Sequence, residues 1–328
     1  MMAQSVSCSA MTGNQQIPVL IVAGPTCSGK SALALEIALR FGGSVINADS
    51  MQVYRELRVL TARPSAADEG RVPHRLYGVI SAAEAFSAAR WREMALKEIA
   101  AAAGQGRLPV LCGGTGLYIK ALTHGLSPIP DIPQSVRRSV RDRFADAATG
   151  AVHQALQAVD PETAGRLPPQ DRQRLLRALE VFEATGRSLV SWQREPAEGP
   201  PPGQKFHTIL LEPPRAALYA ACDARLHAMM GDGALDEVAA LRALDLDPSQ
   251  PAMKALGMRS LLDHLAGRCD LETAVAAAQK ATRNYAKRQK TWFQHQIIAQ
   301  IKVNEQYSEK LRDEIFSKIC KNWLTLPG

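Results

Sequence analysis

The sequence predicts an α/β fold, in which a parallel sheet is covered by helices and interrupted by an all-helical insertion. Three observations support this prediction. Apolar runs alternate with amphipathic stretches over residues 17–122, as strands and helices alternate in parallel sheets. Most of the apolar runs lead into a glycine-rich turn. Residues 134–194 lack a convincing strand pattern and are rich in arginine.

The first predicted strand is IPVLIVA, a continuous apolar run typical of a strand buried on both faces. A helix is expected over KSALALEIALRF, ending at Gly42 and Gly43. A second strand is predicted over GSVINADS and ends at Asp49, and a long alanine-rich helix follows over residues 83–106. The third strand, LPVLCGG, runs into another glycine-rich turn. In such doubly wound sheets, the loops after the strand ends form the functional site.

The expected organisation is a core divided by an insertion. Residues 1–17 are polar, lack the pattern of a secretory signal and are predicted to be a mobile tail. The core covers residues 18–130 and resumes over 204–303 with the strand KFHTILLEPP. Residues 131–203 form the helical insertion and end in a linker rich in proline and glycine. No role is assigned to the extension at 304–328.

Composition narrows the class of protein. Hydrophobic residues make up 46% and charged residues 22% of the 328-residue chain, as in ordinary globular proteins. No run of eighteen apolar residues is present, so no membrane association is expected. The six cysteines lack zinc-binding spacing and predict free thiols in a reducing cytoplasm. We expect a cytoplasmic monomer.

Charge is unevenly distributed along the chain. The formal net charge is +7, and residues 273–304 contain no acidic side chain. The basic residues of this stretch are Lys280, Arg283, Lys287, Arg288, Lys290 and Lys302. On a helix, four of them would form a stripe without acidic partners: Lys280, Arg283, Lys287 and Lys290. Such a stripe indicates a polyanionic partner such as a nucleic acid.

The most specific motif matches GxxxxGK[ST], between the first predicted strand and its helix. Its glycines let backbone N–H groups converge on phosphate oxygens, and the helix N-terminus and the lysine add positive charge. The last residue, a serine, could place its hydroxyl on Mg²⁺. The predicted phosphate-binding residues are Gly24, Pro25, Thr26, Cys27, Ser28, Gly29, Lys30 and Ser31.

A second feature argues against nucleotide hydrolysis. Such enzymes have a further strand ending in a Mg²⁺-binding aspartate, whereas LPVLCGG ends in Cys112 and glycines. Asp49, after SVINA, is the only acidic residue expected at a strand end. It could hold Mg²⁺ through water, act as a base or only cap a turn.

Further blocks extend the pattern along the chain. They are DSMQVY, TARP, PHRL, GGTGLYIKAL, GLSPIP, DRQRLLRALEVFEATGRSL, KALGMRSL and TRNYAKRQKTWF. Together with GPTCSGKS, and in this order, they resemble the tRNA dimethylallyltransferases from about residue 18 to residue 294. The resemblance implies a P-loop kinase-like core. It also implies transfer of a dimethylallyl group from dimethylallyl diphosphate to N6 of adenosine 37 in the tRNA anticodon loop, with Mg²⁺ assisting departure of pyrophosphate.

The resemblance also implies roles for individual residues. Asp49 would be the general base, Lys30, Thr115 and Arg283 would be further catalytic residues, and Ser31 would be the metal ligand. The anticodon stem-loop would be contacted by Asp49, Ser50, Met51, Gln52, Thr115, Arg137, Gln173, Arg174, Leu175, Leu176, Arg177, Arg259 and Lys287. Trp292 and Phe293 could stack on bases, but core packing is the preferred interpretation for both.

Two segments depart from the family pattern. Leu60 replaces a glycine before TARP, which leaves open whether the turn near Thr61 keeps the family's geometry. Met258 and Ser260 replace the usual aromatic and acidic residues beside Arg259, so contacts made by those two side chains are not carried over.

Three alternatives remain open at the level of sequence. A P-loop nucleotide or small-molecule kinase would turn over ATP and would not need the basic insertion. An adenylate isopentenyltransferase would use free nucleotides and would not need the tRNA-facing blocks. A non-catalytic RNA-binding protein would not need Asp49 or Lys30.

Overall fold

The computed structural model describes residues 16–197 and 199–323, which fall into two compact units. The larger unit contains the chain up to Thr123 and from Pro202 onward, and the smaller unit contains His124–Pro201. The predicted tail, apart from its last two residues, lies outside the described residues.

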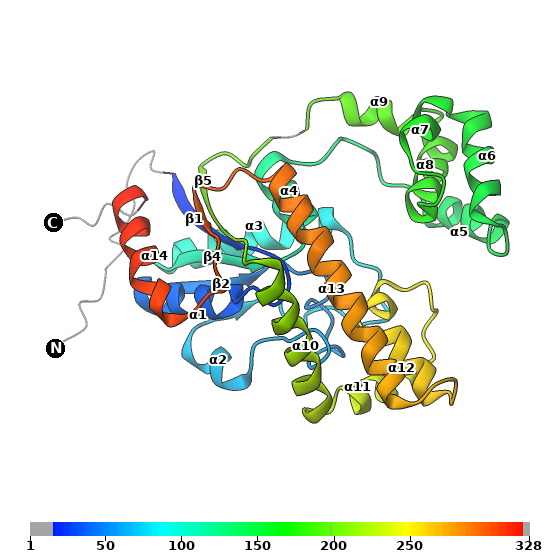
Figure 1. The fold of residues 1–328 in the computed structure, drawn as a ribbon. Coiled ribbons are helices and arrows are strands. Elements are labelled where there is room, and N and C mark those ends of the chain that lie inside the picture. Colours follow the sequence, from blue (N-terminus) through cyan, green and yellow to red (C-terminus); the bar gives the residue numbers. More distant parts are fainter. Residues whose placement is uncertain (1–15, 198, 324–328) are drawn as a thin grey trace, which may run out of the picture. The chain divides into compact units, whose positions relative to one another are not determined.

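A six-stranded parallel sheet forms the centre of the larger unit (Figure 1), with the order β3-β2-β4-β1-β5-β6. Its strands are β1 (Ile17–Ala23), β2 (Gly43–Asn47), β3 (His74–Arg75), β4 (Leu108–Gly113), β5 (Gln204–Leu211) and β6 (Ile301–Val303). The strand resuming after the insertion therefore pairs directly with β1, as the sequence predicted.

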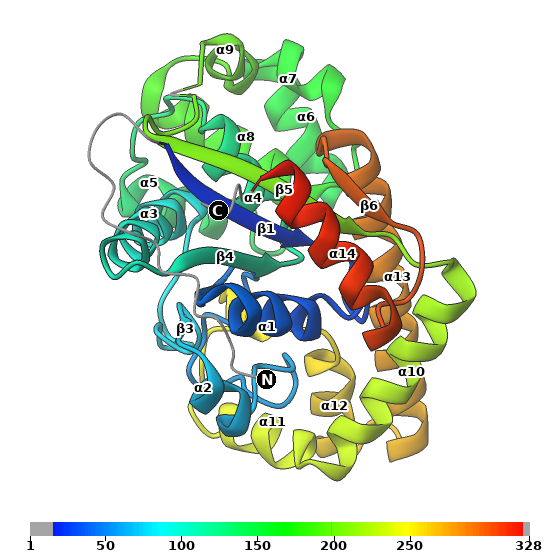
Figure 2. The same cartoon turned by 90° about the vertical axis from the view of Figure 1, so that its left-hand side faces the viewer.

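Helices cover both faces of this sheet. Figure 2 shows α1 and α14 lying over one face, and they pack there against Leu20 and Val22 of β1. The alternate residues Val19 and Ile21 face the other side, where α3, α4 and α13 pack. The helices of this unit are α1 (Lys30–Phe41), α2 (Ala66–Arg71), α3 (Ala88–Gly104), α4 (Gly116–His124), α10 (Arg215–Gly231), α11 (Ala234–Arg242), α12 (Met258–Leu265), α13 (Leu271–Gln296) and α14 (Glu309–Asn322).

The described residues of the smaller unit contain helices and no strand, and they form a core of their own. Its helices are α5 (Gln134–Arg143), α6 (Thr149–Val159), α7 (Pro161–Arg166), α8 (Arg172–Thr185) and α9 (Leu189–Arg194). Val152, Leu156, Leu175 and Leu179 are central to this core. Asp171 caps α8 by accepting the backbone N–H of Arg174.

The predicted and observed elements differ mainly at their ends. Helix α1 ends where predicted, because Gly42 adopts the left-handed conformation. Helix α3 begins only after Ser87, whose hydroxyl accepts the N–H of Arg90 as an N-cap. Strand β2 ends at Asn47, so Asp49 lies in the following loop. Strands β3 and β6 and helix α14 were not predicted.

The sequence also led to expectations about the cysteines and about membrane association. The described cysteines Cys27, Cys112, Cys222, Cys269 and Cys320 are all free thiols. Across residues 16–197 and 199–323, no helix has the length and apolarity that a membrane span requires.

The turn after β4 depends on glycines, because neighbouring segments approach its backbone closely. A Cβ on Gly113 would lie 2.1 Å from the carbonyl group of Ala48, and one on Gly116 would lie 2.1 Å from the Trp292 ring. A Cβ on Gly114 would lie 2.3 Å from the amide nitrogen of Gln289. The turn therefore meets the β2 loop and α13 directly.

We expect Gly113→Ala to destabilise the larger unit, because the added methyl group meets backbone that cannot rotate away. The expected loss is about 1–3 kcal/mol in the free energy of unfolding, measured by urea denaturation. Gly104→Ala is the matched control, since nothing lies within 4 Å of its Cβ position. Equal stability of the two variants would contradict this account of the turn.

Candidate active site

The phosphate loop, residues 24–31, connects β1 to α1 at the carboxyl edge of the sheet. Gly29, with φ of 88°, directly precedes α1, so the loop amides and the helix N-terminus meet at one point. Lys30 donates to the carbonyl oxygen of Pro25 at 3.3 Å, which folds its side chain back over the loop. The predicted phosphate loop thus has the expected position between strand and helix.

The buried amide of Gln289 joins this loop to the turn after β4. The Thr26 N–H donates to Gln289 Oε1 at 2.7 Å, and Gln289 Nε2 donates to the Gly114 carbonyl at 2.7 Å. Only 6% of Gln289 is exposed. The sequence analysis did not identify this residue, because a glutamine in a basic helix carries no distinctive signal.

The segment after β6 also packs on the phosphate loop. Gln306 Nε2 donates to the Cys27 carbonyl at 2.8 Å, and Tyr307 lies 2.7 Å from the Cβ position of Gly29. Residues of the extension at 304–328, to which the sequence assigned no role, therefore support the loop from outside.

Asp49 is held by short hydrogen bonds within its own loop. Its backbone N–H donates to Asn47 Oδ1 at 2.8 Å, and its Oδ1 atom accepts the Met51 N–H at 2.9 Å. Asn47 is fully buried and also donates to the carbonyl oxygens of Asp49 and Leu76. Asp49 does cap a turn, but the same carboxylate lines the cavity described below.

Thr115 connects the loops after β2 and β4. Its hydroxyl accepts the Ser50 N–H at 2.9 Å and lies 3.2 Å from the Ser50 hydroxyl oxygen. The Tyr285 hydroxyl hydrogen-bonds to Thr115 and Gln289, and burial raises the pKa of Tyr285 above its usual value. Thr115 therefore helps to position the Asp49 loop.

A cavity of about 340 Å³ lies between the phosphate loop and the Asp49 loop. Its lining brings together several predicted site residues with the missed residues Arg225 and Gln306. The polar and charged groups at its wall are Thr26, Cys27, Lys30, Ser31, Asp49, Gln52, Thr61, Arg225 and Gln306. Cations thus lie on the phosphate side of the cavity, and a carboxylate lies on the side of the β2 loop.

The cation of α10 at this cavity is Arg225, where the sequence analysis had chosen Arg283 of α13. Arg225 donates to the Thr26 hydroxyl oxygen. Arg283 instead pairs with Asp223 at 2.5 Å and is not among the residues that line the cavity. No spacing pattern singled out Arg225, because it belongs to an ordinary amphipathic helix.

The turn at residues 58–62 does not need a glycine at position 60, because Leu60 is not among the residues with positive φ. The residue with positive φ is Ala62, at 53°, while Leu60 is buried in the core. The Glu237 carboxylate of α11 accepts the backbone N–H groups of Arg58, Val59 and Leu60 at 2.7–2.9 Å. Gln52 donates to the carbonyl oxygens of Thr61 and Ala62, so its amide holds this turn.

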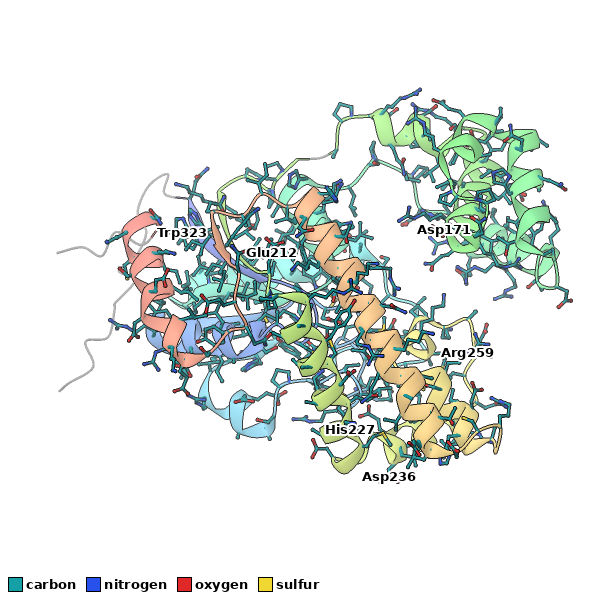
Figure 3. All side chains as sticks on the ribbon, in the orientation of Figure 1. Asp171, Glu212, His227, Asp236, Arg259 and Trp323 are labelled. Carbon is teal, nitrogen blue, oxygen red and sulfur yellow. The ribbon has the colours of Figure 1, made fainter. Side chains whose placement is uncertain are left out.

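A second acidic residue follows a strand, contrary to the sequence analysis. Glu212 directly follows β5 (Figure 3), whereas Asp49 was taken as the sole strand-end acid. Only 8% of Glu212 is exposed, and its Oε1 atom has no hydrogen-bond partner. Glu212 does not line the cavity of the phosphate loop.

The cationic stripe predicted on α13 is partly neutralised within the protein, which corrects the expectation that it lacks acidic partners. Arg283 pairs with Asp223, and Lys290 donates to the Pro213 carbonyl at 2.9 Å. Lys280 and Lys287 remain exposed. Lys287 also lines an open cavity of about 570 Å³ along α13, together with Arg288 and Trp292.

The remaining predicted residues divide between surface and core. Arg259 of α12 is exposed (Figure 3), and Met51 packs against the core of the larger unit. Phe293 is fully buried, as expected, while Trp292 is half-buried beside it. Met258 is fully buried, and the Ser260 hydroxyl donates to the Gly257 carbonyl.

In the helical unit, Arg141 and Arg177 pair with one buried carboxylate, and the charge of Arg137 acts on Arg177. Glu180, only 3% exposed, pairs with Arg141 at 3.2 Å and with Arg177 at 3.6 Å. Burial lowers the pKa of Arg177, and the charges of Arg137 and Arg141 lower it further. One carboxylate thus orients a cluster whose net charge stays positive.

Residues 173–177 do not all reach the surface of this unit. Gln173 and Arg174 are exposed, and Arg174 pairs with Asp171 at 3.3 Å. Leu175 is fully buried in the helical core, and Leu176 is half-buried against it. Leu175 therefore supports the helix, and its side chain is not presented to a partner as the resemblance implied.

We expect Gln289→Leu to loosen both glycine-rich loops, because it leaves the Thr26 N–H and the Gly114 carbonyl without their buried partner. Each group left unpaired costs about 1–3 kcal/mol in the free energy of unfolding. Affinity for inorganic pyrophosphate, measured by calorimetry, should fall as well. Gln294→Leu, at an exposed position of the same helix, should change neither quantity.

Comparison with known proteins identifies the family to which this chain belongs. The family model "IPP transferase" matches residues 52–296. The tRNA dimethylallyltransferase of Rhodospirillum centenum is 58% identical over 282 residues, which cover 86% of this chain and 90% of that protein. The tRNA dimethylallyltransferase of Paramagnetospirillum magneticum is 54% identical, covering 94% of this chain and 98% of that protein.

Solved structures agree with the fold. The full-length tRNA isopentenylpyrophosphate transferase of Bacillus halodurans superimposes with a TM-score of 0.67 at 30% identity, covering 94% of this chain and 96% of that one. A eukaryotic dimethylallyltransferase acting on tRNA has a TM-score of 0.77 at 24% identity, covering 93% of this chain and 78% of that one. The second likeness concerns the fold alone.

Proposed function

The chain belongs to the IPP transferase family, and from that premise we propose that it is a tRNA dimethylallyltransferase. It transfers the dimethylallyl group of dimethylallyl diphosphate to N6 of adenosine 37 in the tRNA anticodon loop and releases pyrophosphate. The observation that carries the proposal is the cavity of about 340 Å³, because Lys30, Arg225 and Asp49 all line it.

The two sides of this cavity suit the two halves of the reaction. The amides of the phosphate loop, Lys30 and Arg225 bind the diphosphate and stabilise the negative charge that grows on it as the carbon–oxygen bond breaks. Thr26, whose hydroxyl accepts from Arg225, is placed to donate its own proton to a diphosphate oxygen. The loop therefore serves a leaving group.

Asp49 suits the nucleophile. The exocyclic amine of adenine is weakly nucleophilic, because its lone pair is delocalised into the ring. A carboxylate beside the diphosphate site orients this amine and takes its proton as the new carbon–nitrogen bond forms. Asn47 and the Met51 N–H hold the Asp49 loop in place for that task.

The donor set also fits Mg²⁺. Mg²⁺ prefers oxygen ligands and is usually held by one or two protein oxygens together with phosphates and waters. The Ser31 hydroxyl and the Asp49 carboxylate line the same cavity, and a bound diphosphate adds its own oxygens. When bound there, Mg²⁺ supplies positive charge that favours departure of pyrophosphate.

Each of the two units has cations that can contact the tRNA. In the larger unit, Arg259 and Lys287 are exposed, and Arg288 and Trp292 line the cavity along α13. In the helical unit, the arginines around Glu180 and the exposed pair Gln173 and Arg174 offer donors to phosphates. The reaction requires the target base to leave its stack.

Labelling distinguishes this proposal from its rivals. The protein is incubated with radiolabelled dimethylallyl diphosphate, Mg²⁺ and unmodified tRNA, with AMP or ATP in place of tRNA as controls. We expect label in tRNA alone. Label only in AMP would identify an adenylate isopentenyltransferase, and ATP turnover without prenyl transfer would identify a kinase.

We expect Asp49→Asn to lower the rate of prenyl transfer by about 10²–10⁴-fold, because asparagine cannot accept the proton. Its amide oxygen can still accept the Met51 N–H, so tRNA affinity should stay within a few-fold. Single-turnover rates and filter binding measure the two quantities. Asp263→Asn, at a half-buried position of α12 where the side chain pairs with Arg268, is the control. A comparable loss of tRNA binding would mean that Asp49 is a structural carboxylate.

Charge reversal of Arg174 and Arg177 together should raise KM for tRNA and leave kcat nearly unchanged. For every phosphate that the variant no longer binds, the salt dependence of tRNA affinity should weaken by about 0.7–0.9 in log–log slope. Arg166→Glu is the control within the same unit, because its side chain pairs with Glu162 one turn away. An unchanged slope would place the RNA-binding residues elsewhere.

The proposal includes a cytoplasmic monomer. Free thiols suit a reducing compartment, and the proposed substrate is an intracellular RNA. Light scattering of the protein with and without tRNA measures the number of protein chains in each complex. The monomeric state stays a prediction.

A further inference from the structure

Two cysteines lie side by side at the phosphate loop. Cys222 of α10 is fully buried and forms a small apolar cluster with Leu218 and Ala286. Cys27 packs against this cluster. Cys27 is half-buried and lines the phosphate cavity, whereas Cys222 does not line it. A partly exposed thiol therefore lies beside a buried one.

The surroundings of Cys27 favour its thiolate. A hydrogen bond from the Cys222 thiol and the charges of Arg225 and Lys30 lower the pKa of Cys27, and burial opposes them; together they bring it to about 6. The same pairing raises the pKa of Cys222, and burial and Asp223 add to that effect. The two thiols therefore share one negative charge, which resides on Cys27.

Cys112 provides a contrast within the same site. It is the last residue but one of β4, and only 2% of it is exposed. A thiol with this environment is inert, whereas a partly exposed thiolate among cations is a reactive nucleophile. The phosphate loop thus holds one reactive and one unreactive cysteine.

We propose that Cys27 and Cys222 are an oxidisable pair, in which a hydroperoxide that enters the phosphate cavity oxidises Cys27 and Cys222 then closes a disulfide. This modification lies beyond the proposed transfer reaction. The disulfide changes the conformation of the phosphate loop so that it no longer binds phosphate, and a thiol reductant reverses this change.

The chemistry balances with hydrogen peroxide as the oxidant. The Cys27 thiolate attacks one peroxide oxygen, the O–O bond breaks, and Cys27 becomes a sulfenic acid while the other oxygen leaves as hydroxide and takes a proton from solvent to become water. The Cys222 sulfur then attacks the Cys27 sulfur and displaces the hydroxyl group, which leaves as water with the Cys222 proton. Two thiols lose two electrons in total, and one peroxide becomes two waters.

The cross-link has a consequence for phosphate binding. The Cys27 carbonyl accepts from Gln306, and Thr26 beside it donates to Gln289, so position 27 lies within the part of the loop that these contacts shape. A covalent bond from this position to α10 moves a wall of the cavity and removes a negative charge near Arg225. Conversely, bound diphosphate covers Cys27 and disfavours its thiolate, so it should protect the pair.

The main test uses the full chain, purified under reducing conditions, freed of reductant and treated with hydrogen peroxide. Peptide mass spectrometry without reduction should find Cys27 linked to Cys222, and dithiothreitol should reverse the link. Affinity for inorganic pyrophosphate should fall by about tenfold or more on oxidation and return on reduction. Pyrophosphate added before peroxide should slow the reaction. Links between other cysteines, or Cys27 oxidised without a partner, would overturn the proposal.

The variant Cys222→Ala separates the two cysteines. It should retain basal prenyl transfer, while peroxide should carry Cys27 to the sulfinic acid, which dithiothreitol does not reverse. Cys269→Ala should behave like the wild-type protein. If Cys222→Ala does not fold, Cys222→Ser serves the same purpose. A wild-type reversible response in a folded Cys222 variant would exclude Cys222 as the partner.

Alkylation provides an independent measurement. Iodoacetamide should modify Cys27 with a rate that rises to half its maximum near pH 6, and Cys112 should stay unmodified. A midpoint near the ordinary thiol value would contradict the proposal. Because the link is detected by mass, its absence leaves the proposed function untouched. Absence of prenyl transfer by the reduced enzyme would refute that function alone.

Discussion

The geometry of the site depends on the buried side-chain amide of Gln289. Its oxygen accepts the Thr26 N–H of the phosphate loop, and its nitrogen donates to the Gly114 carbonyl of the turn after β4. One side chain therefore sets the distance between these two loops. An apolar residue cannot take this place, because both backbone groups are removed from water. Helix α13 is thereby fixed across the carboxyl edge of the sheet, and the glycines of the β4 turn are needed to admit it.

The distribution of charge around the cavity then selects the chemistry. Lys30 and Arg225 favour an anionic group beside the phosphate loop, while Asp49 stands with the loop after β2. A neutral amine can approach the carboxylate, whereas a second anion is repelled by it. Cations farther along α13 are partly occupied by Asp223 and by the Pro213 carbonyl, which leaves the exposed ones for an external polyanion.

Local patterns predicted those parts of the molecule that local interactions determine. The strand β1, the phosphate loop and helix α1 follow from an apolar run, a glycine motif and amphipathic spacing, and Asp49 follows from its place after β2. Arg225, Gln289 and Gln306 were missed because their partners lie far away in the sequence, up to 279 residues for Gln306 and Cys27. The side chain of Leu175 is buried, because a sequence block that includes a contact surface also includes the residues beneath it.

The contacts of Gln306 and Tyr307 with the phosphate loop have a consequence for how the enzyme is made. The loop leaves the ribosome well before the residues that shape it, which follow it by 263 and 279 residues in the sequence. Contacts of such long sequence separation form late in folding, since the chain between them must be ordered first. A nascent chain therefore carries the phosphate motif long before it can bind a diphosphate, and prenyl transfer begins only once synthesis has passed β6.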